Sequence, residues 1–154
     1  MNNTVDFYHE QPEESSGFLL WQVSMLWQRK MKRALDKLDL THTQYVLLAV
    51  LAWLSKSNQT VTQVDIAKHS NTDRMMVSKV LRTLQEKGFV NRKEDKTDTR
   101  AKNISLSKSG KTILEKAMKI VEETDNSFFS VLQSKEKSFN TDMRKLVRGN
   151  NDVD

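Results

Sequence analysis

Apolar side chains recur at steps of three and four along residues 16–38, a pattern that predicts an amphipathic helix. Its main apolar stripe consists of Leu20, Val23, Trp27, Met31, Ala34 and Leu38. Further apolar residues widen the surface at the N-terminal end, namely Phe18, Leu19, Trp21, Met25 and Leu26. So wide an apolar surface calls for two neighbours, one within the domain and a second that can belong to another subunit.

A second helix is predicted to begin in the sequence LTHTQY. Thr41 is a suitable N-cap, Gln44 follows three residues later, and Leu40 with Tyr45 can form a hydrophobic staple. The next residues, YVLLAVLAWL, are apolar on every side of a helix, so we expect this helix to form the buried centre of the domain. The polar run KSNQ then ends it.

Two more helices are predicted between residues 62 and 88, with the short segment NTD between them. The first covers about residues 62–69 and opens with a variant capping box formed by Thr62 and Asp65. The second begins near Asp73 and is expected to stop at Gly88, where a left-handed residue is needed and Phe89 can pack back on the helix. Its expected buried face consists of Val77, Val80, Leu81 and Leu84.

Two short strands are predicted on either side of the loop KEDKTDTRAK, residues 93–102, which has no large apolar side chain. Val90 on one side, and Ile104 and Leu106 on the other, alternate with polar residues. Ser107 then caps a long helix whose apolar residues extend to Leu132, and a last helix covers about residues 135–147. Residues 1–15 are expected to be flexible, and residues 149–154 to form a tail.

These elements predict a mainly α protein with a small β-hairpin, folded as a single domain over residues 16–148. One proline and four glycines among 154 residues fit such long helices. The absence of cysteine excludes disulfides and thiolate metal sites within this chain. The longest apolar run is about half of a ~20-residue membrane span, and the N-terminus lacks a signal-peptide pattern. We therefore expect a cytoplasmic protein with no membrane partner.

The positive charge is concentrated in one third of the chain. Residues 62–111 contain 12 basic and 6 acidic residues, a net +6, whereas the net charge of the whole chain is +5. The remaining residues therefore carry a net charge of −1. A basic segment inside a neutral scaffold indicates a polyanion partner, most often nucleic acid, although a basic surface also serves solubility.

The helix that begins near Asp73 has the features of a DNA recognition helix. The short helix, turn, second helix and hairpin follow the order of a winged helix-turn-helix. Opposite the buried face lie Arg74, Met75, Ser78, Lys79 and Arg82, which could reach base edges and phosphates in the major groove. Thr62 and Gln63, at a helix N-terminus, suit a phosphate. An ordinary amphipathic helix with a solvated basic face is the alternative, and Met76 is expected to face the core.

The loop between the strands is predicted to be a basic finger that contacts DNA. It carries Lys93 together with Lys96, Arg100 and Lys102, and an arginine at such a tip can enter a narrow minor groove. Asp95 and Asp98 repel phosphate, so their expected role is to fix the loop, Asp98 by pairing with an arginine or by capping the turn.

The run DIAKHSNTDRMMVSKVLRTLQEKGFVNRKEDKTDTRAKNISLSKSGK resembles the winged-helix core of the MarR family of bacterial transcription regulators. The specific features are VSKVLRTLQEKGFVNR and DKTDTRAKNISLSKSG, and the resemblance extends over about residues 16–148. It implies a DNA-binding lobe at about 41–107 and dimerisation helices at about 16–38 and 108–148. It also implies a homodimer that binds a pseudo-palindromic double-stranded operator, with Arg100 of each wing in the flanking minor groove.

A small aromatic or amphipathic effector is a further expectation, and Trp27, Met31 and Trp53 are candidates to line its pocket, although simple core packing is the alternative. The three histidines are scattered, so no metal site and no cofactor is expected. No nucleophile elbow, phosphate loop or paired carboxylates suggest an enzyme. We therefore expect a ligand-responsive dimeric repressor. The alternative is a winged-helix architectural or protein-interaction module without an effector.

Overall fold

The computed structural model describes residues 4–94 and 102–151, arranged as a helical molecule with one two-stranded antiparallel sheet. The elements, in chain order, are η1 (Pro12–Glu14), α1 (Ser16–Leu35), η2 (Asp36–Leu38), α2 (His42–Leu54), α3 (Gln63–Ser70), α4 (Arg74–Glu86), β1 (Val90–Glu94), β2 (Lys102–Leu106), α5 (Lys108–Phe129), η3 (Ser130–Lys135) and α6 (Glu136–Gly149). This order confirms the predicted mainly α fold with a β-hairpin wing.

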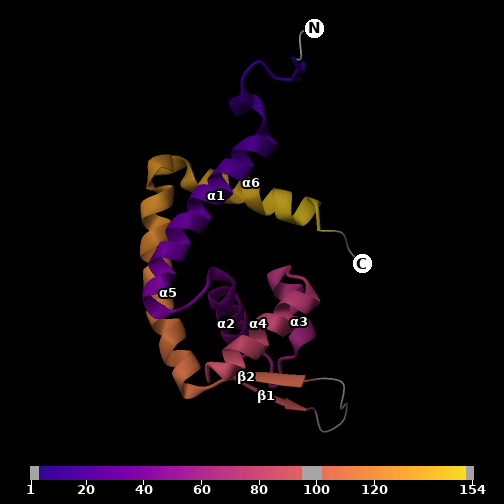
Figure 1. The fold of residues 1–154 in the computed structure, drawn as a ribbon, viewed down its shortest axis with the longest axis vertical. Helices are drawn as coiled ribbons and strands as arrows, with labels where there is room; N and C mark the ends of the chain where they lie inside the picture. Colours follow the sequence, from indigo (N-terminus) through magenta and orange to yellow (C-terminus); the bar gives the residue numbers. More distant parts are fainter. Residues whose placement is uncertain (1–3, 95–101, 152–154) are drawn as a thin grey trace.

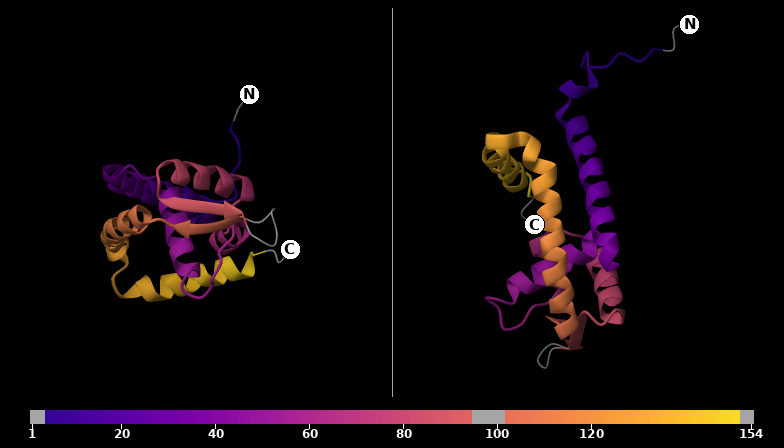
Figure 2. Two further views of the ribbon diagram at one scale, coloured as in Figure 1. Left: turned by 90° about the horizontal axis from the view of Figure 1, so that it is seen from below. Right: turned by 90° about the vertical axis from the view of Figure 1, so that its left-hand side faces the viewer.

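The molecule has a lobe at one end and two long helices that project from it (Figure 1). The lobe contains α2, α3, α4 and the hairpin, whereas α1 and α5 extend together toward the other end (Figures 1 and 2). There α6 turns back across the top of the lobe (Figure 1). The hairpin therefore lies at the end of the molecule opposite the first turns of α1.

The two predicted capping boxes are present. Thr41 accepts from the backbone N–H of Gln44 at 3.1 Å, and the Gln44 side chain accepts from the Thr41 N–H, also at 3.1 Å. Thr62 and Asp65 make the same reciprocal pair at the start of α3, at 3.3 and 2.8 Å. Each box satisfies backbone donors that have no partner within their own helix. Both helix starts are thus determined by local sequence.

A single hydrophobic core joins the lobe to the long helices. Leu47, Leu48 and Leu51 of α2 are fully buried at its centre, as the all-round apolar pattern predicted. The other fully enclosed side chains include Ile66, Val77, Leu81, Leu84 and Ala117. Leu35 of α1 is also fully buried, although it lies outside the apolar stripe predicted for that helix. Residues from α1 and α5 therefore share one core with the lobe.

The end of α4 has the predicted Schellman geometry. Gly88 has a φ of 76°, the Phe89 N–H donates to the carbonyl of Leu84, and the Gly88 N–H donates to that of Gln85, both at 2.9 Å. A second glycine is required nearby for another reason. A Cβ on Gly110 would lie 1.9 Å from the carbonyl oxygen of Phe89, so only glycine lets α5 pack against this turn.

Two sequence expectations need correction. Met76 does not face the core but is 50% exposed, because Val77 and Leu81 already fill the space beneath α4. The long helix does not extend to Leu132 but ends at Phe129, where a 3-10 segment with a kink at Gln133 (φ 51°, ψ −127°) leads into α6. No local sequence feature marks Met76 as exposed, whereas the polar run QSK, residues 133–135, coincides with the kink before α6.

The surplus apolar surface predicted for the first helix is exposed in the single chain. Leu20, Trp21 and Leu26 of α1 are 65%, 60% and 52% exposed, and Leu146 and Val147 of α6 are exposed as well. Only Met31 and Leu35 of α1 are fully buried. Within the described part of the chain, no helix is both long and apolar enough to cross a membrane.

Candidate nucleic-acid interface

A tight turn fixes α4 relative to α3. Asn71 adopts the left-handed conformation (φ 51°) and ends α3, and the Thr72 N–H donates back to the Ala67 carbonyl at 3.0 Å. Asp73 then caps α4, because its carboxylate accepts from the Met76 N–H at 3.0 Å. Asparagine tolerates left-handed backbone better than most residues, which explains how the turn forms without glycine. The result is a helix-turn-helix.

One face of α4 carries the predicted DNA contacts. Arg74, Met75, Lys79 and Arg82 are exposed, with Met75 81% exposed, and Ser78 lies half-buried between them. The opposite face is closed by the core. Within the described residues, the ion pairs do not include Arg74, Lys79 or Arg82, so these cations are available to an external anion. An α-helix fits into the major groove of B-DNA, so this exposed face could contact base edges and phosphates there.

The start of α3 is more strongly constrained than the sequence indicated. The Thr62 N–H is not free for a phosphate, because the carboxylate of Asp65 accepts it at 2.8 Å and also accepts from the Thr62 hydroxyl at 2.7 Å. The Gln63 side chain has a partner too, since its Oε1 accepts from Arg92 Nη2 at 3.1 Å. Of the two predicted phosphate ligands, Gln63 therefore remains the better placed.

Arg92 is a site residue that sequence reasoning missed. It lies on β1 opposite Ile104 of β2, on the side of the strand that also carries Val90. Val90 and Ile104 are buried, so this side faces the protein. In a strand, alternate residues point to the same side, so Arg92 was expected on the side of the apolar Val90. A charged residue at such a position was the sequence signal that could have identified Arg92.

The hairpin is joined to α3 by backbone contacts as well as by Arg92. The Ile104 N–H donates to the Val61 carbonyl at 2.8 Å, and Thr62 forms an isolated antiparallel bridge with Asn103. Lys93 is exposed on β1, and Lys102 begins β2 opposite Glu94. The loop residues Asp95, Lys96, Asp98 and Arg100 lie outside the described residues.

Lys87 connects the end of α4 with the segment between α1 and α2. Its Nζ donates to the backbone carbonyl of Asp39, to Asp39 Oδ2 at 3.3 Å and to Oε1 of the buried Gln44 at 3.4 Å. Asp39 is held in left-handed backbone, with a φ of 51°. The end of α4 is therefore linked to α2 and to the segment between α1 and α2, which the amphipathic pattern alone did not predict.

The three predicted pocket residues do not form one pocket in the chain. Met31 is fully buried in the core, because the helix turns that face α2 and α5 are those with Met31 and Leu35. Trp27 lines an open hollow of about 600 Å³ beside His42 and Thr43. Trp53 lines a separate hollow of about 410 Å³ between α2 and α5, together with Met118. In the single chain, Trp27 and Trp53 therefore line two separate surface hollows, and their role toward an effector stays a prediction.

The Trp27 hollow contains a cluster of polar and aromatic groups. Trp27 Nε1 donates to Asp125 Oδ1 at 2.7 Å, and the His42 ring lies edge-on to Trp27, with 4.7 Å between the ring centroids. Burial lowers the pKa of His42 from its ordinary value, and the nearby Asp125 carboxylate partly opposes this shift. Burial, together with Asp125 and Glu122, raises the pKa of Tyr45. This cluster joins α1, α2 and α5.

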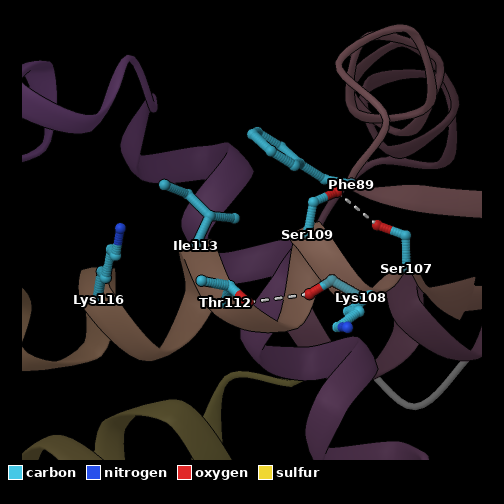
Figure 3. Close-up of a pocket in the computed structure, with 7 residues that line it drawn as sticks. All are labelled: Phe89, Ser107, Lys108, Ser109, Thr112, Ile113 and Lys116. Atoms are coloured by element: carbon cyan, nitrogen blue, oxygen red, sulfur yellow. Dashed lines mark hydrogen bonds between the residues drawn. The ribbon is translucent and has the colours of Figure 1, made fainter.

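A third hollow, of about 590 Å³, lies where α5 begins (Figure 3). The hydroxyls of Ser107 and Ser109 lie 3.0 Å apart there, and both donate to the Gly88 carbonyl, at 2.6 and 2.8 Å. Phe89 and Ile113 form its apolar wall. These serines complete the end of α4 and the cap of α5, which gives them a structural role. In the described part of the chain, no three acidic, histidine or cysteine side chains gather as a metal site would require.

Comparison with known proteins identifies the fold and the family. Residues 36–123 match the family described as "ArnR1-like, winged-helix domain". The chain is 42% identical over 137 residues to the uncharacterized HTH-type transcriptional regulator YdcH of Bacillus subtilis (strain 168), covering 89% of this chain and 92% of that protein. It is 31% identical to the organic hydroperoxide resistance transcriptional regulator of the same organism, over 78% of each.

A solved structure of similar fold is the MepR–DNA complex of Staphylococcus aureus, with a TM-score of 0.79 and 29% identity over 88% of this chain and 98% of that chain. The family match over residues 36–123 contains the helix-turn-helix, both strands of the hairpin and the first part of α5. The chain thus has an ArnR1-like winged-helix domain and belongs to the MarR family of DNA-binding transcription regulators.

Proposed function

We propose that this chain regulates transcription in the cytoplasm as a sequence-specific homodimer on double-stranded DNA. The observation that carries the proposal is the exposed face of α4, where Arg74, Lys79 and Arg82 lie on the same side as Met75, which is 81% exposed at the helix N-terminus. These exposed side chains do not contribute to packing of the hydrophobic core. The base edges and phosphates of a major groove offer partners to both its charged and its apolar members.

Individual residues of the face are assigned by their place along the helix. The N-terminal turn of a recognition helix reads bases, so Arg74 bonds to guanine and Met75 contacts a thymine methyl. Ser78 and Lys79 lie one turn further along, and Arg82 binds phosphate. The remaining contacts are assigned to Thr62 and Gln63 at α3 and to the wing residues Lys96, Asp98, Arg100 and Lys102, with Arg100 in the minor groove and Asp98 fixing the loop.

The exposed apolar residues of α1 and α6 support the homodimer. Large apolar side chains exposed together on one element mark an interaction surface, and a second copy offers an identical one. We assign residues 16–38 and 108–148 to dimerisation, residues 41–107 to DNA binding, and 1–15 and 149–154 to flexible ends. Two recognition helices could then enter successive major grooves about 34 Å apart on a pseudo-palindromic operator.

We further propose that the protein is a repressor released by a small aromatic or amphipathic effector. The hollows beside Trp27 and Trp53 lie between the long helices and the lobe, where a ligand would change the angle between them. An effector that prefers a dimer with wrongly spaced recognition helices lowers the population that fits the operator. The Lys87 contacts support such coupling, because they join the end of α4 to the segment between α1 and α2.

The test is binding of the purified chain to the DNA upstream of its own gene, compared with scrambled DNA, by fluorescence anisotropy. We expect a strong preference for the upstream DNA, two chains for each site and a steep dependence on salt. Equal and weak binding to both DNAs would favour an architectural or protein-interaction module. Addition of aromatic compounds to the bound complex then tests for release.

A further inference from the structure

The contact between Arg92 and Gln63 joins the wing to the helix that precedes the recognition helix. Arg92 Nη2 donates to Gln63 Oε1 at 3.1 Å, across 29 residues of sequence. Gln63 is the first residue of α3, and Arg92 lies at the middle of β1. The backbone fixes this pairing, because the Ile104 N–H of the wing donates to the Val61 carbonyl at 2.8 Å. The two side chains therefore meet in a defined geometry.

The chemistry of arginine determines how the Gln63 amide is turned. A guanidinium has only donors, so the amide must offer it the oxygen and direct its NH₂ group elsewhere. A DNA phosphate has only acceptors on its oxygens. A glutamine without a partner can present either its amide oxygen or its NH₂ group, and the oxygen would repel a phosphate. Because Arg92 holds the oxygen of Gln63, the NH₂ group is left to donate to a phosphate.

Arg92 is half-buried between the wing and α3. Its Nε is buried, and no described group accepts the Nε hydrogen. Among residues 4–94 and 102–151, no carboxylate forms an ion pair with it. A buried donor without an acceptor destabilises the fold, so a role beyond stability is expected at this position. Because Nη2 of its guanidinium donates to the Gln63 amide, Arg92 can act on DNA through the side chain that it holds.

We propose that Arg92 is a positioning residue for DNA binding, which fixes the Gln63 amide so that its NH₂ group donates to a phosphate of the DNA backbone. This inference rests on the proposed DNA-binding function and adds to it one residue and one contact. It concerns phosphate, so it applies to duplex DNA of any sequence as well as to the operator.

The direct test is a double-mutant cycle with Gln63→Met and Arg92→Met, each of which removes polar groups and keeps an unbranched side chain. Each variant should weaken binding by about ten- to hundredfold for each half-site, the usual effect of one hydrogen bond to a charged acceptor. The double variant should bind no more weakly than either single variant, because both changes remove the same contact. If the losses of binding free energy in the two single variants add up in the double variant, the proposal is wrong.

The dependence of affinity on salt separates positioning from direct contact. A neutral amide releases no counterion, so both single variants should leave the slope of log affinity against log salt unchanged. If Arg92 binds phosphate directly, Arg92→Met should reduce that slope by about 0.9 for each subunit. A reduced slope would therefore contradict the positioning role even if affinity falls.

Gln63→Glu provides a variant that keeps the contact with Arg92 and loses the donor. Its carboxylate accepts from the guanidinium, so the melting temperature should not fall, yet DNA binding should weaken more than in Gln63→Met because the carboxylate repels phosphate. Nuclear magnetic resonance adds a structural readout, since the side-chain amide signals of Gln63 should shift in Arg92→Met and on addition of DNA. Unchanged binding by Gln63→Glu would refute the inference.

All measurements use the full chain with both upstream and scrambled duplexes. Failure of the proposed function would appear in the unmodified chain, as equal affinity for the two duplexes. Failure of this inference would appear only in the variants, as additive losses or a changed slope on the scrambled duplex. If the unmodified chain binds neither duplex at low salt, both proposals are wrong.

Discussion

Asp73 and the three residues after it form the start of α4. Some of them stabilise the helix, and others are exposed where DNA could bind. The Asp73 carboxylate holds the Met76 N–H at 3.0 Å, which completes the start of the helix. Arg74 and Met75 do not pack in the core and are exposed at the N-terminal end of α4. In a recognition helix, this end contacts the base edges. Structure and recognition are thus assigned to neighbouring side chains.

Arg74→Ala should relax sequence preference more than it weakens non-specific binding. A bidentate contact with guanine distinguishes bases by about 1–3 kcal/mol, so the ratio of upstream to scrambled affinity should fall by roughly ten- to hundredfold. Competition anisotropy with the two duplexes measures this ratio. Arg148→Ala, which removes an equal charge from the end of α6, is the matched control. An equal loss on both duplexes would mean that Arg74 contacts only phosphate.

His42 makes the stability of the fold depend on pH. Burial lowers the folded-state pKa of His42 below its ordinary value of 6.5, so the unfolded chain takes up a proton more readily than the folded chain. The free energy of unfolding should therefore be highest above pH 6.5 and should decrease as the pH falls from 6.5 toward the lower pKa of His42 in the folded chain. Urea unfolding at several pH values should show a shallower decrease for His42→Gln. Identical pH profiles for the two proteins would contradict this account.

At the scale of whole elements, local patterns predicted most of the fold. The pairs Thr41 with Gln44 and Thr62 with Asp65 act over three residues, and Gly88 ends α4 through its own backbone, so each signal is contained in a short stretch. The buried face of α4 followed from helical spacing alone. These features need no knowledge of what packs against them.

The parts that the sequence did not predict depend on residues far apart in the chain. Lys87 meets Asp39 across 48 residues, and Arg92 meets Gln63 across 29. Met76 has an apolar side chain and was expected inside, but the space beneath α4 was already occupied. Of the candidate interface, the face of α4 was predicted correctly as an exposed surface. Its connections to the segment between α1 and α2 and to the wing required the tertiary structure.

Leu84→Ala should destabilise the lobe without changing sequence preference. Leu84 is fully buried on the core side of α4, and truncation of such a side chain costs about 2–5 kcal/mol. Chemical denaturation measures the loss, and DNA competition on the folded fraction checks the preference. Met76→Ala is the control on the same helix: its side chain is 50% exposed, so stability should change by less than about 0.5 kcal/mol. A similar loss in both variants would contradict the observed packing of α4.

Across the whole molecule, the long helices leave the lobe and end in exposed apolar surface. The hairpin is at one end, and the N-terminal half of α1 is at the other (Figure 1). DNA binding and dimerisation are therefore assigned to opposite ends of one molecule. The shared core and the Lys87 contacts join these ends, so a change in the dimer could alter the position of α4.

Trp21→Asp should convert the protein to monomers and weaken operator binding. A charge at the centre of an apolar dimer surface is left without a partner when that surface is buried. Sedimentation velocity measures the mass, and thermal unfolding shows whether the fold is retained. Trp53→Asp is matched, because both tryptophans are 60% exposed but Trp53 lies on α2. Dimers of Trp21→Asp as stable as those of the unmodified chain would exclude α1 from the interface.

The most direct measurement of the central claim is the affinity of the unmodified chain for its own upstream DNA and for scrambled DNA across a salt series. The account predicts a large preference for the upstream DNA, two chains on each site and a steep loss of affinity with salt, because paired basic faces bind phosphates as well as bases. Weak binding that is equal on both DNAs, or binding of one chain at a time, would contradict it.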